Sequence, residues 1–212
     1  MTNTPDLIEQ LTAHASPVKR LRPPAWRAAI WLAVYGVVLA LAVIVFDAWP
    51  NMRMRLQSMP FVWEIAGTVL TGVAAIVAAF YLALPDRSRS IALLVVPPLA
   101  VWLGSSGYGC LVNIGDGGDG WLRSSDCVMF IIGTSVPLGL ALYVVLRRAV
   151  PLDPLAVLAV GGLGVAALSA VVLQFFHPFD TTIIDLVLHM VAVLTVVAVM
   201  TTLGRRGMQL PA

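Results

Sequence analysis

The sequence predicts an all-α integral membrane bundle of six transmembrane helices, with a short amphipathic helix in a cytoplasmic N-terminal tail. Of the 212 residues, 59% are hydrophobic and only 11% are charged, a composition that cannot give a single globule a wettable surface. The apolar residues form continuous runs of roughly 20 residues, long enough to cross a hydrocarbon core. Because this hydrophobicity is continuous rather than alternating, a β-barrel is excluded.

The N-terminal tail begins with a predicted helix. Thr4-Pro5-Asp6 has the form of a helix start, with a hydroxyl acceptor, an early proline and an acid near the positive end of the dipole. Leu7, Ile8 and Leu11 then recur at helical spacing, and Pro17 ends the pattern. A helix of about ten residues is marginal alone in water, so its apolar stripe needs a surface to lie against.

Three surfaces are open to this helix: a groove on another protein, the bilayer surface, or the chain's own inner loops. Helices that lie on a membrane usually carry Lys or Arg on the polar face, whereas this helix carries Asp6 and Glu9. The acidic face favours a protein partner, which would order the helix as it docks.

The basic segment KRLRPPAWR, residues 19–27, joins the tail to the first span. Its cations lie where the positive-inside rule places them, and Trp26 and Trp31 suit the interfacial belt, so its main expected role is to anchor the chain to membrane lipids. Pro23 and Pro24 predict an extended elbow before the first span.

The six spans follow from the apolar runs. The third span is interrupted by Pro97 and Pro98, a kink that neighbouring helices can tolerate. The predicted spans cover residues 28–46, 62–84, 91–112, 127–146, 155–176 and 182–203.

Orientation follows from the 13 Lys and Arg residues, because short basic loops stay in the cytoplasm. Three of them, Arg53, Arg55 and Arg123, lie on the side opposite the termini, which leaves ten on the side of the termini. Both termini are therefore expected in the cytoplasm, with a tail over residues 1–26, a membrane domain over 27–205 and a C-terminal tail over 206–212. The ten are Lys19, Arg20, Arg22, Arg27, Arg87, Arg89, Arg147, Arg148, Arg205 and Arg206.

Small residues recur every four positions in two spans, which lets helix backbones approach closely. We interpret these positions as packing faces rather than as functional sites. They are Gly67, Thr71, Ala75 and Ala79 in the second span, and Gly162, Ala166 and Ala170 in the fifth.

The two cysteines flank the outer segment GCLVNIGDGGDGWLRSSDC. Cys110 ends the third predicted span and Cys127 begins the fourth, on the oxidising side where a disulfide is permitted. Closing this loop would stabilise the fold by roughly 3 kcal/mol, enough to bias a two-state bundle. The pair is either a redox or thiophilic-metal sensor that changes how the two spans pack, or a permanent structural bridge.

A few ionisable residues lie within or beside the last span, where placing a charge in the membrane is energetically unfavourable. Asp185 and His189 are four residues apart, hence on one helical face, and we expect them to satisfy each other. With His177 and Asp180 just outside, and with Glu64 and the cysteines, they are weak candidates for a cation site. No local spacing marks a metal centre, and no catalytic triad or cofactor motif is present in the sequence.

The opening DLIEQLTAHASPVKRLRPP, the following WRAAIWL, the six spans and the outer cysteine pair resemble the membrane anti-sigma factors called negative regulators of sigma F. The resemblance covers essentially the whole chain. It implies that the tail and inner face hold an extracytoplasmic-function sigma factor inactive at the bacterial inner membrane, without direct contact to nucleic acid, until stress releases it. It assigns sigma-factor contact to Leu7, Ile8, Leu11, Pro17, Val18, Lys19, Arg20, Leu21 and Arg22.

Two other classes of membrane protein stay open. A small-solute transporter would also be a six-span bundle, but it should show paired broken helices or internal symmetry, and only the third span is plainly broken. A membrane thiol-disulfide oxidoreductase would use the outer cysteines, but it normally needs a second redox pair or a bound cofactor. The sequence therefore favours a regulator that is not an enzyme and needs no cofactor.

Overall fold

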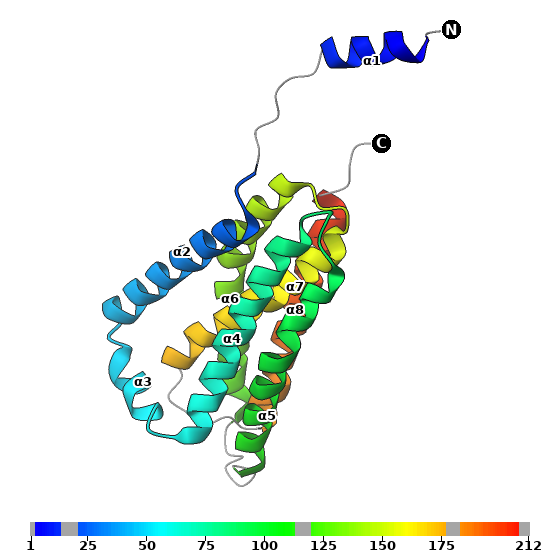
Figure 1. Cartoon of the computed structure of the whole chain (residues 1–212). Coiled ribbons are helices and arrows are strands. Elements are labelled where there is room, and N and C mark those ends of the chain that lie inside the picture. The colour runs from blue at the N-terminus through cyan, green and yellow to red at the C-terminus, as the bar shows by residue number, and fades with distance from the viewer. Residues whose placement is uncertain (1–2, 14–20, 113–119, 177–182, 208–212) are drawn as a thin grey trace.

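A computed structural model of the chain describes residues 3–13, 21–112, 120–176 and 183–207 (Figure 1). Within these ranges the chain forms helices and turns and no strand. Six of the helices are long and apolar enough to cross a membrane. The predicted all-α, six-span fold class is confirmed, and the chain is a multi-pass membrane protein by these criteria.

Eight α-helices and two short 3-10 helices make up the described chain. In order they are α1 (Thr4–Ala13), α2 (Pro24–Val45), α3 (Trp49–Arg55), α4 (Met59–Leu82), η1 (Arg89–Val95), α5 (Val96–Val112), α6 (Gly120–Leu146), η2 (Arg147–Ala149), α7 (Pro154–Phe176) and α8 (Ile183–Gly207).

Prolines mark several helix starts, because proline lacks an N–H and its fixed φ suits the first turn. Pro24 opens α2, and Pro60 follows the first residue of α4. The predicted break at Pro97 and Pro98 is a junction of the same kind, where the 3-10 helix η1 ends and α5 begins. Pro137 differs from these, because it lies in the interior of a helix, α6.

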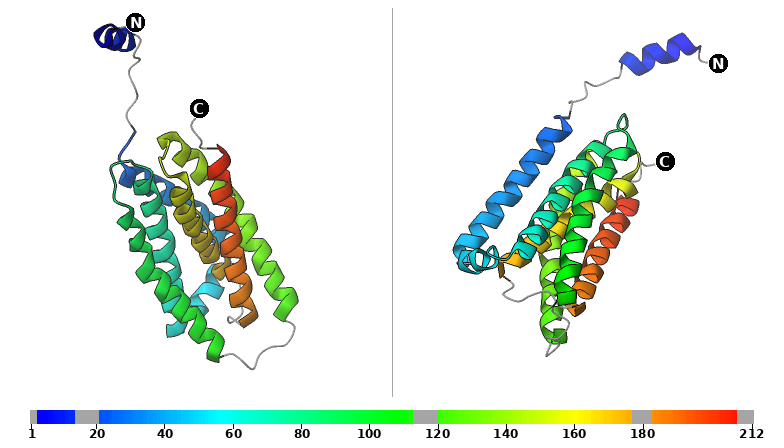
Figure 2. Two further views of the ribbon diagram at one scale, coloured as in Figure 1. Left: turned by 90° about the vertical axis from the view of Figure 1, so that its right-hand side faces the viewer. Right: turned by 60° about the horizontal axis from the view of Figure 1, so that its bottom comes forward.

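Helices α4 and α7 form the centre of the bundle, with α5, α6 and α8 packed around them (Figures 1 and 2). Their contact is close because small residues face each other: a Cβ added at Gly164 of α7 would lie 3.1 Å from Ala75 Cβ of α4. All seven small residues predicted to form packing faces are buried. The small-residue pattern was therefore a correct prediction of the inner helix faces.

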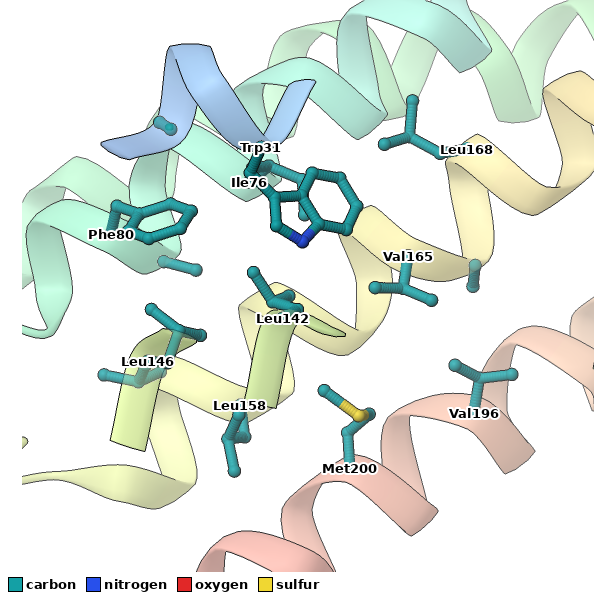
Figure 3. Close-up of a cluster of buried hydrophobic side chains, with 14 of the residues drawn as sticks. Trp31, Ile76, Phe80, Leu142, Leu146, Leu158, Val165, Leu168, Val196 and Met200 are labelled. Atoms are coloured by element: carbon teal, nitrogen blue, oxygen red, sulfur yellow. The ribbon is translucent and has the colours of Figure 1, made fainter. Parts of the chain in front are cut away.

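The main core draws on five helices (Figure 3). Apolar burial of this kind stabilises the bundle by roughly 25 cal/mol per Å² where it replaces contact with water, and by close packing within the membrane. Trp31 of α2 lies over this core, so α2 is packed at its first turns. The labelled members are Trp31, Ile76, Phe80, Leu142, Leu146, Leu158, Val165, Leu168, Val196 and Met200.

Helix α2 leans away from the other spans toward its C-terminal end, where α3 connects it to α4 (Figures 1 and 2). The Tyr35 hydroxyl holds it by donating a hydrogen bond to the Leu168 carbonyl of α7 at 2.9 Å. The start of α2 and the end of α8 lie at the same end of the bundle, which we call the tail end; α3 lies at the opposite, distal end (Figure 1).

Candidate functional site

The tail helix α1 is present where the sequence predicted it. Its first turn closes through the Leu7 N–H, which donates to the Asn3 carbonyl at 3.1 Å. None of its ten residues is buried, and it stands apart from the bundle in every view (Figures 1 and 2). The predicted stripe is open to contact: Leu7, Ile8 and Leu11 are 46%, 57% and 65% exposed.

The second part of the predicted contact surface is the basic segment after α1. Leu21 and Arg22 are both exposed at the base of the tail, beside the start of α2. Pro17, Val18, Lys19 and Arg20 lie outside the described residues.

The junction between tail and bundle has a defined geometry. Pro23 adopts φ −51 and ψ 143, the extended conformation expected for the elbow, and α2 begins at Pro24. One turn later the Arg27 Nη2 donates to the Val145 carbonyl of α6 at 2.7 Å, and its guanidinium lies 5.2 Å from the Phe80 ring centroid. Val145 is in the last turn of α6, where carbonyls lack partners within the helix. Arg27 therefore ties the base of the tail to the end of α6.

At the distal end, Cys127 is only 5% exposed and packs with Ile131, Leu173 and Ala192. It begins the fourth span, as predicted, and it lies about two turns inside α6, because this helix starts earlier, at Gly120. The side chain of Cys110 lies outside the described residues, and so does the predicted pairing of the two cysteines.

A cavity of about 430 Å³ lies among α4, α5, α7 and α8, with polar groups gathered toward the distal end. Asp185 and His189 both line it, in agreement with their predicted place on one face of the last span. Glu64 lines it from α4, and its Oε1 accepts a hydrogen bond from the Ser106 hydroxyl at 3.1 Å. Most of the remaining wall is apolar.

Three of the candidate cation ligands, Glu64, Asp185 and His189, line this cavity. His177 and Asp180 lie outside the described residues. Among the described residues, no group of three or more His, Cys, Asp or Glu side chains is placed to hold a metal ion.

Helix α3 supplies polar contacts that the sequence analysis missed. Asn51 Nδ2 donates to the Phe175 carbonyl at 3.0 Å, and Arg55 Nη1 donates to the Gln174 carbonyl at 3.2 Å. Both acceptors are carbonyls in the last turn of α7. Carbonyls at this position receive no hydrogen bond from within the helix, and they carry the negative end of the helix dipole. The sequence did contain an indication of these contacts, because Asn51 and Arg55 are four residues apart and would share one face of a helix.

Residues 11–209 match the family described as negative regulator of sigma F. The chain belongs to this family. The match includes all six spans, the elbow and Leu11, whereas Leu7 and Ile8 precede it. No curated protein and no solved structure matches the chain. Membership of the negative regulator of sigma F family implies a sigma factor as the regulated partner.

Proposed function

We propose that the chain is a non-enzymatic anti-sigma factor that holds an extracytoplasmic-function sigma factor at the cytoplasmic face of the bacterial inner membrane. The observation that carries this proposal is the exposed apolar stripe of α1, set apart from the bundle in a chain of the negative regulator of sigma F family. A solvated stripe of three large side chains is stabilised when a partner groove covers it.

The size of this stripe limits what α1 can do alone. Fully burying three such side chains contributes about 1.5 to 3 kcal/mol each, and ordering a short segment on binding costs about 2 to 5 kcal/mol. The difference corresponds to weak binding. The proposed contact therefore extends through residues 17–22, whose cations would add contacts to acidic groups on the sigma factor.

The proposal assigns the tail, residues 1–26, to the cytoplasm. Its support is the excess of Lys and Arg on the side of the termini, ten against three. Residues 27–205 then form the membrane domain, 206–212 a second cytoplasmic tail, and α3 lies on the periplasmic side.

We propose that release of the sigma factor depends on the cysteine pair and on helix α6. On oxidation, Cys110 and Cys127 would each lose a proton, their sulfurs would form one bond, and two electrons would pass to a thiol oxidant such as diamide. Cys127 and Val145 are 18 residues apart on α6, about 27 Å along its axis. Because Val145 accepts from Arg27 at the base of the tail, a shift of α6 would move the elbow and the sigma-contact segment.

The test is retention of sigma factors by full-length protein reconstituted in nanodiscs, compared with a version lacking residues 1–24. The full-length protein is expected to retain an extracytoplasmic-function sigma factor, and the truncated protein to lose it while keeping its thermal stability. Equal retention by both proteins would contradict the assignment of the tail.

A further inference from the structure

A groove of about 710 Å³ runs between α2 and α6 at the tail end. It exists because α2 leans away from the bundle, which leaves a face of α6 uncovered. Its α2 wall carries Ile30, Val34 and Val38 at four-residue spacing, all exposed, and its α6 wall carries Leu138 and Ala141. From Arg27 to Val38 the groove extends about 16 Å along α2, roughly half the thickness of a hydrocarbon core. Its depth is that of one leaflet.

The mouth of this groove is strongly basic. Arg22, Arg27 and Arg148 line it, and none of the described residues that line it is acidic. Three cations gathered in one place repel one another unless an anion lies among them. The groove therefore pairs a cationic mouth with apolar walls.

Arg27 has donor capacity that the described residues leave unused. Its Nη2 donates to the Val145 carbonyl at 2.7 Å, while the Phe80 ring lies under the guanidinium. Its Nη1 is buried and has no hydrogen-bond partner in the described structure. The first turn of α2 adds uncapped backbone N–H groups, since Pro23 provides no side-chain cap. Guanidinium groups and helix N-termini both bind phosphate.

We propose that this groove binds an anionic phospholipid from the leaflet at the tail end of the bundle. The phosphate lies among Arg22, Arg27 and Arg148, and one acyl chain lies along Ile30, Val34 and Leu138. A soluble anion would leave the apolar walls unused, and a zwitterionic lipid would not neutralise three arginines. Because Arg22 also belongs to the base of the tail, the bound lipid positions the elbow; the site itself does not depend on sigma-factor binding.

The test measures lipid retained by the full-length protein in nanodiscs made from equal amounts of phosphatidylglycerol and phosphatidylcholine. Native mass spectrometry of the released protein should show phosphatidylglycerol in preference to phosphatidylcholine by about tenfold or more. Arg27→Gln with Arg148→Gln should abolish the preference. The matched control, Arg205→Gln with Arg206→Gln, removes the same charge from the same end of the bundle outside the groove and should keep it.

A second pair of variants tests the acyl chain without changing charge. Ala141→Phe fills the groove and should lower phosphatidylglycerol retention severalfold, whereas Ala198→Phe on the exposed face of α8 should not. Equal losses from the two arginine pairs, or no effect of Ala141→Phe, would overturn the proposal in favour of a diffuse surface charge. Deletion of residues 1–13 should leave the lipid preference unchanged, because no α1 residue lines the groove.

Discussion

At the residue scale, two glycines of the membrane spans have different environments: Gly67 lies at a close contact between two helices, whereas Gly36 does not. A Cβ added at Gly67 of α4 would lie 2.7 Å from the backbone nitrogen of Trp102 in α5, and 2.9 Å from its Cα. Backbone atoms cannot move aside as a flexible side chain does, so α4 and α5 would have to separate. Gly36 of α2 has no such neighbour within 4 Å. The same substitution is therefore expected to have opposite effects at the two positions.

Gly67→Ala should lower the free energy of unfolding by about 1 to 3 kcal/mol through overpacking. Gly36→Ala should raise it by up to about 1 kcal/mol, because alanine has the higher helix propensity. Thermal unfolding of the two purified variants in one detergent measures the difference. A Gly67→Ala protein as stable as Gly36→Ala would contradict the close approach of α4 and α5.

The sequence predicted that the small residues of α4 are buried, but it did not predict which residues of the neighbouring helices they contact. Four-residue spacing placed Gly67 and Thr71 on one face of their helix, and both are buried. The contact of Gly67 with Trp102 joins two helices whose relative rotation is set by the whole bundle. Spacing within one helix carries no information about that rotation.

At the scale of elements, α3 acts as a cap for α7. The Gln174 and Phe175 carbonyls would otherwise end α7 without donors, and α3 supplies them from Arg55 and Asn51. The Arg55 guanidinium is held at the same time by the Phe61 ring, 4.0 Å from its centroid. A seven-residue helix thereby fixes the distal ends of α2, α4 and α7 relative to one another.

Removing these caps should destabilise the protein in a defined order. Asn51→Ala removes a neutral hydrogen bond and should lower the free energy of unfolding by about 0.5 to 1.5 kcal/mol, while Arg55→Ala removes a charged donor and should lower it by about 1.5 to 3 kcal/mol. Arg53→Ala, an exposed cation of the same helix, should change it by less than about 0.5 kcal/mol. Chemical denaturation in mixed micelles measures all three. Equal effects of Arg53→Ala and Arg55→Ala would remove the capping role.

The tail helix gives a sharp prediction for partner binding. Leu11→Asp places a charge within the apolar stripe of α1, and it should weaken sigma-factor binding at least tenfold, because a buried unpaired charge is strongly unfavourable in an interface. Ala13→Asp adds the same charge near the same end of the helix, on the opposite face at 100° per residue. It should change binding less than threefold. Binding of the purified sigma factor to protein in nanodiscs measures both, and equal losses would show that the stripe is not the contact.

Helices with a sustained sequence pattern could be predicted, and α3, which has no such pattern, could not. The six spans and α1 carry sustained periodic or apolar patterns, and the structure reproduces the predicted spans to within a few residues. Helix α3 has seven residues, too few to be stable alone. Its helical form depends on contacts with α7, which no local pattern contains.

At the scale of the whole molecule, the basic residues predict one orientation. Ten Lys and Arg residues lie on the side of the termini and three on the other, so a reporter fused after residue 212 should report the cytoplasm. Alkaline phosphatase placed there should be inactive and a fluorescent protein bright, whereas phosphatase inserted after residue 117 should be active. The reverse result would place the tail outside the cell and separate it from every sigma factor.

The two cysteines allow the release mechanism to be tested without other thiols, since the chain contains no further cysteine. If a bond between Cys110 and Cys127 shifts α6 and thereby the Arg27 contact, diamide should release the sigma factor from the wild-type protein in nanodiscs. Cys110→Ser, Cys127→Ser and the double variant should all retain it, and to the same extent, because a disulfide needs both sulfurs and loss of either removes the whole effect. Half-effects in the single variants would indicate independent modification of two thiols. Full release from the double variant would show that the oxidant acts elsewhere, and α6 would lose its proposed role in carrying the signal to the tail.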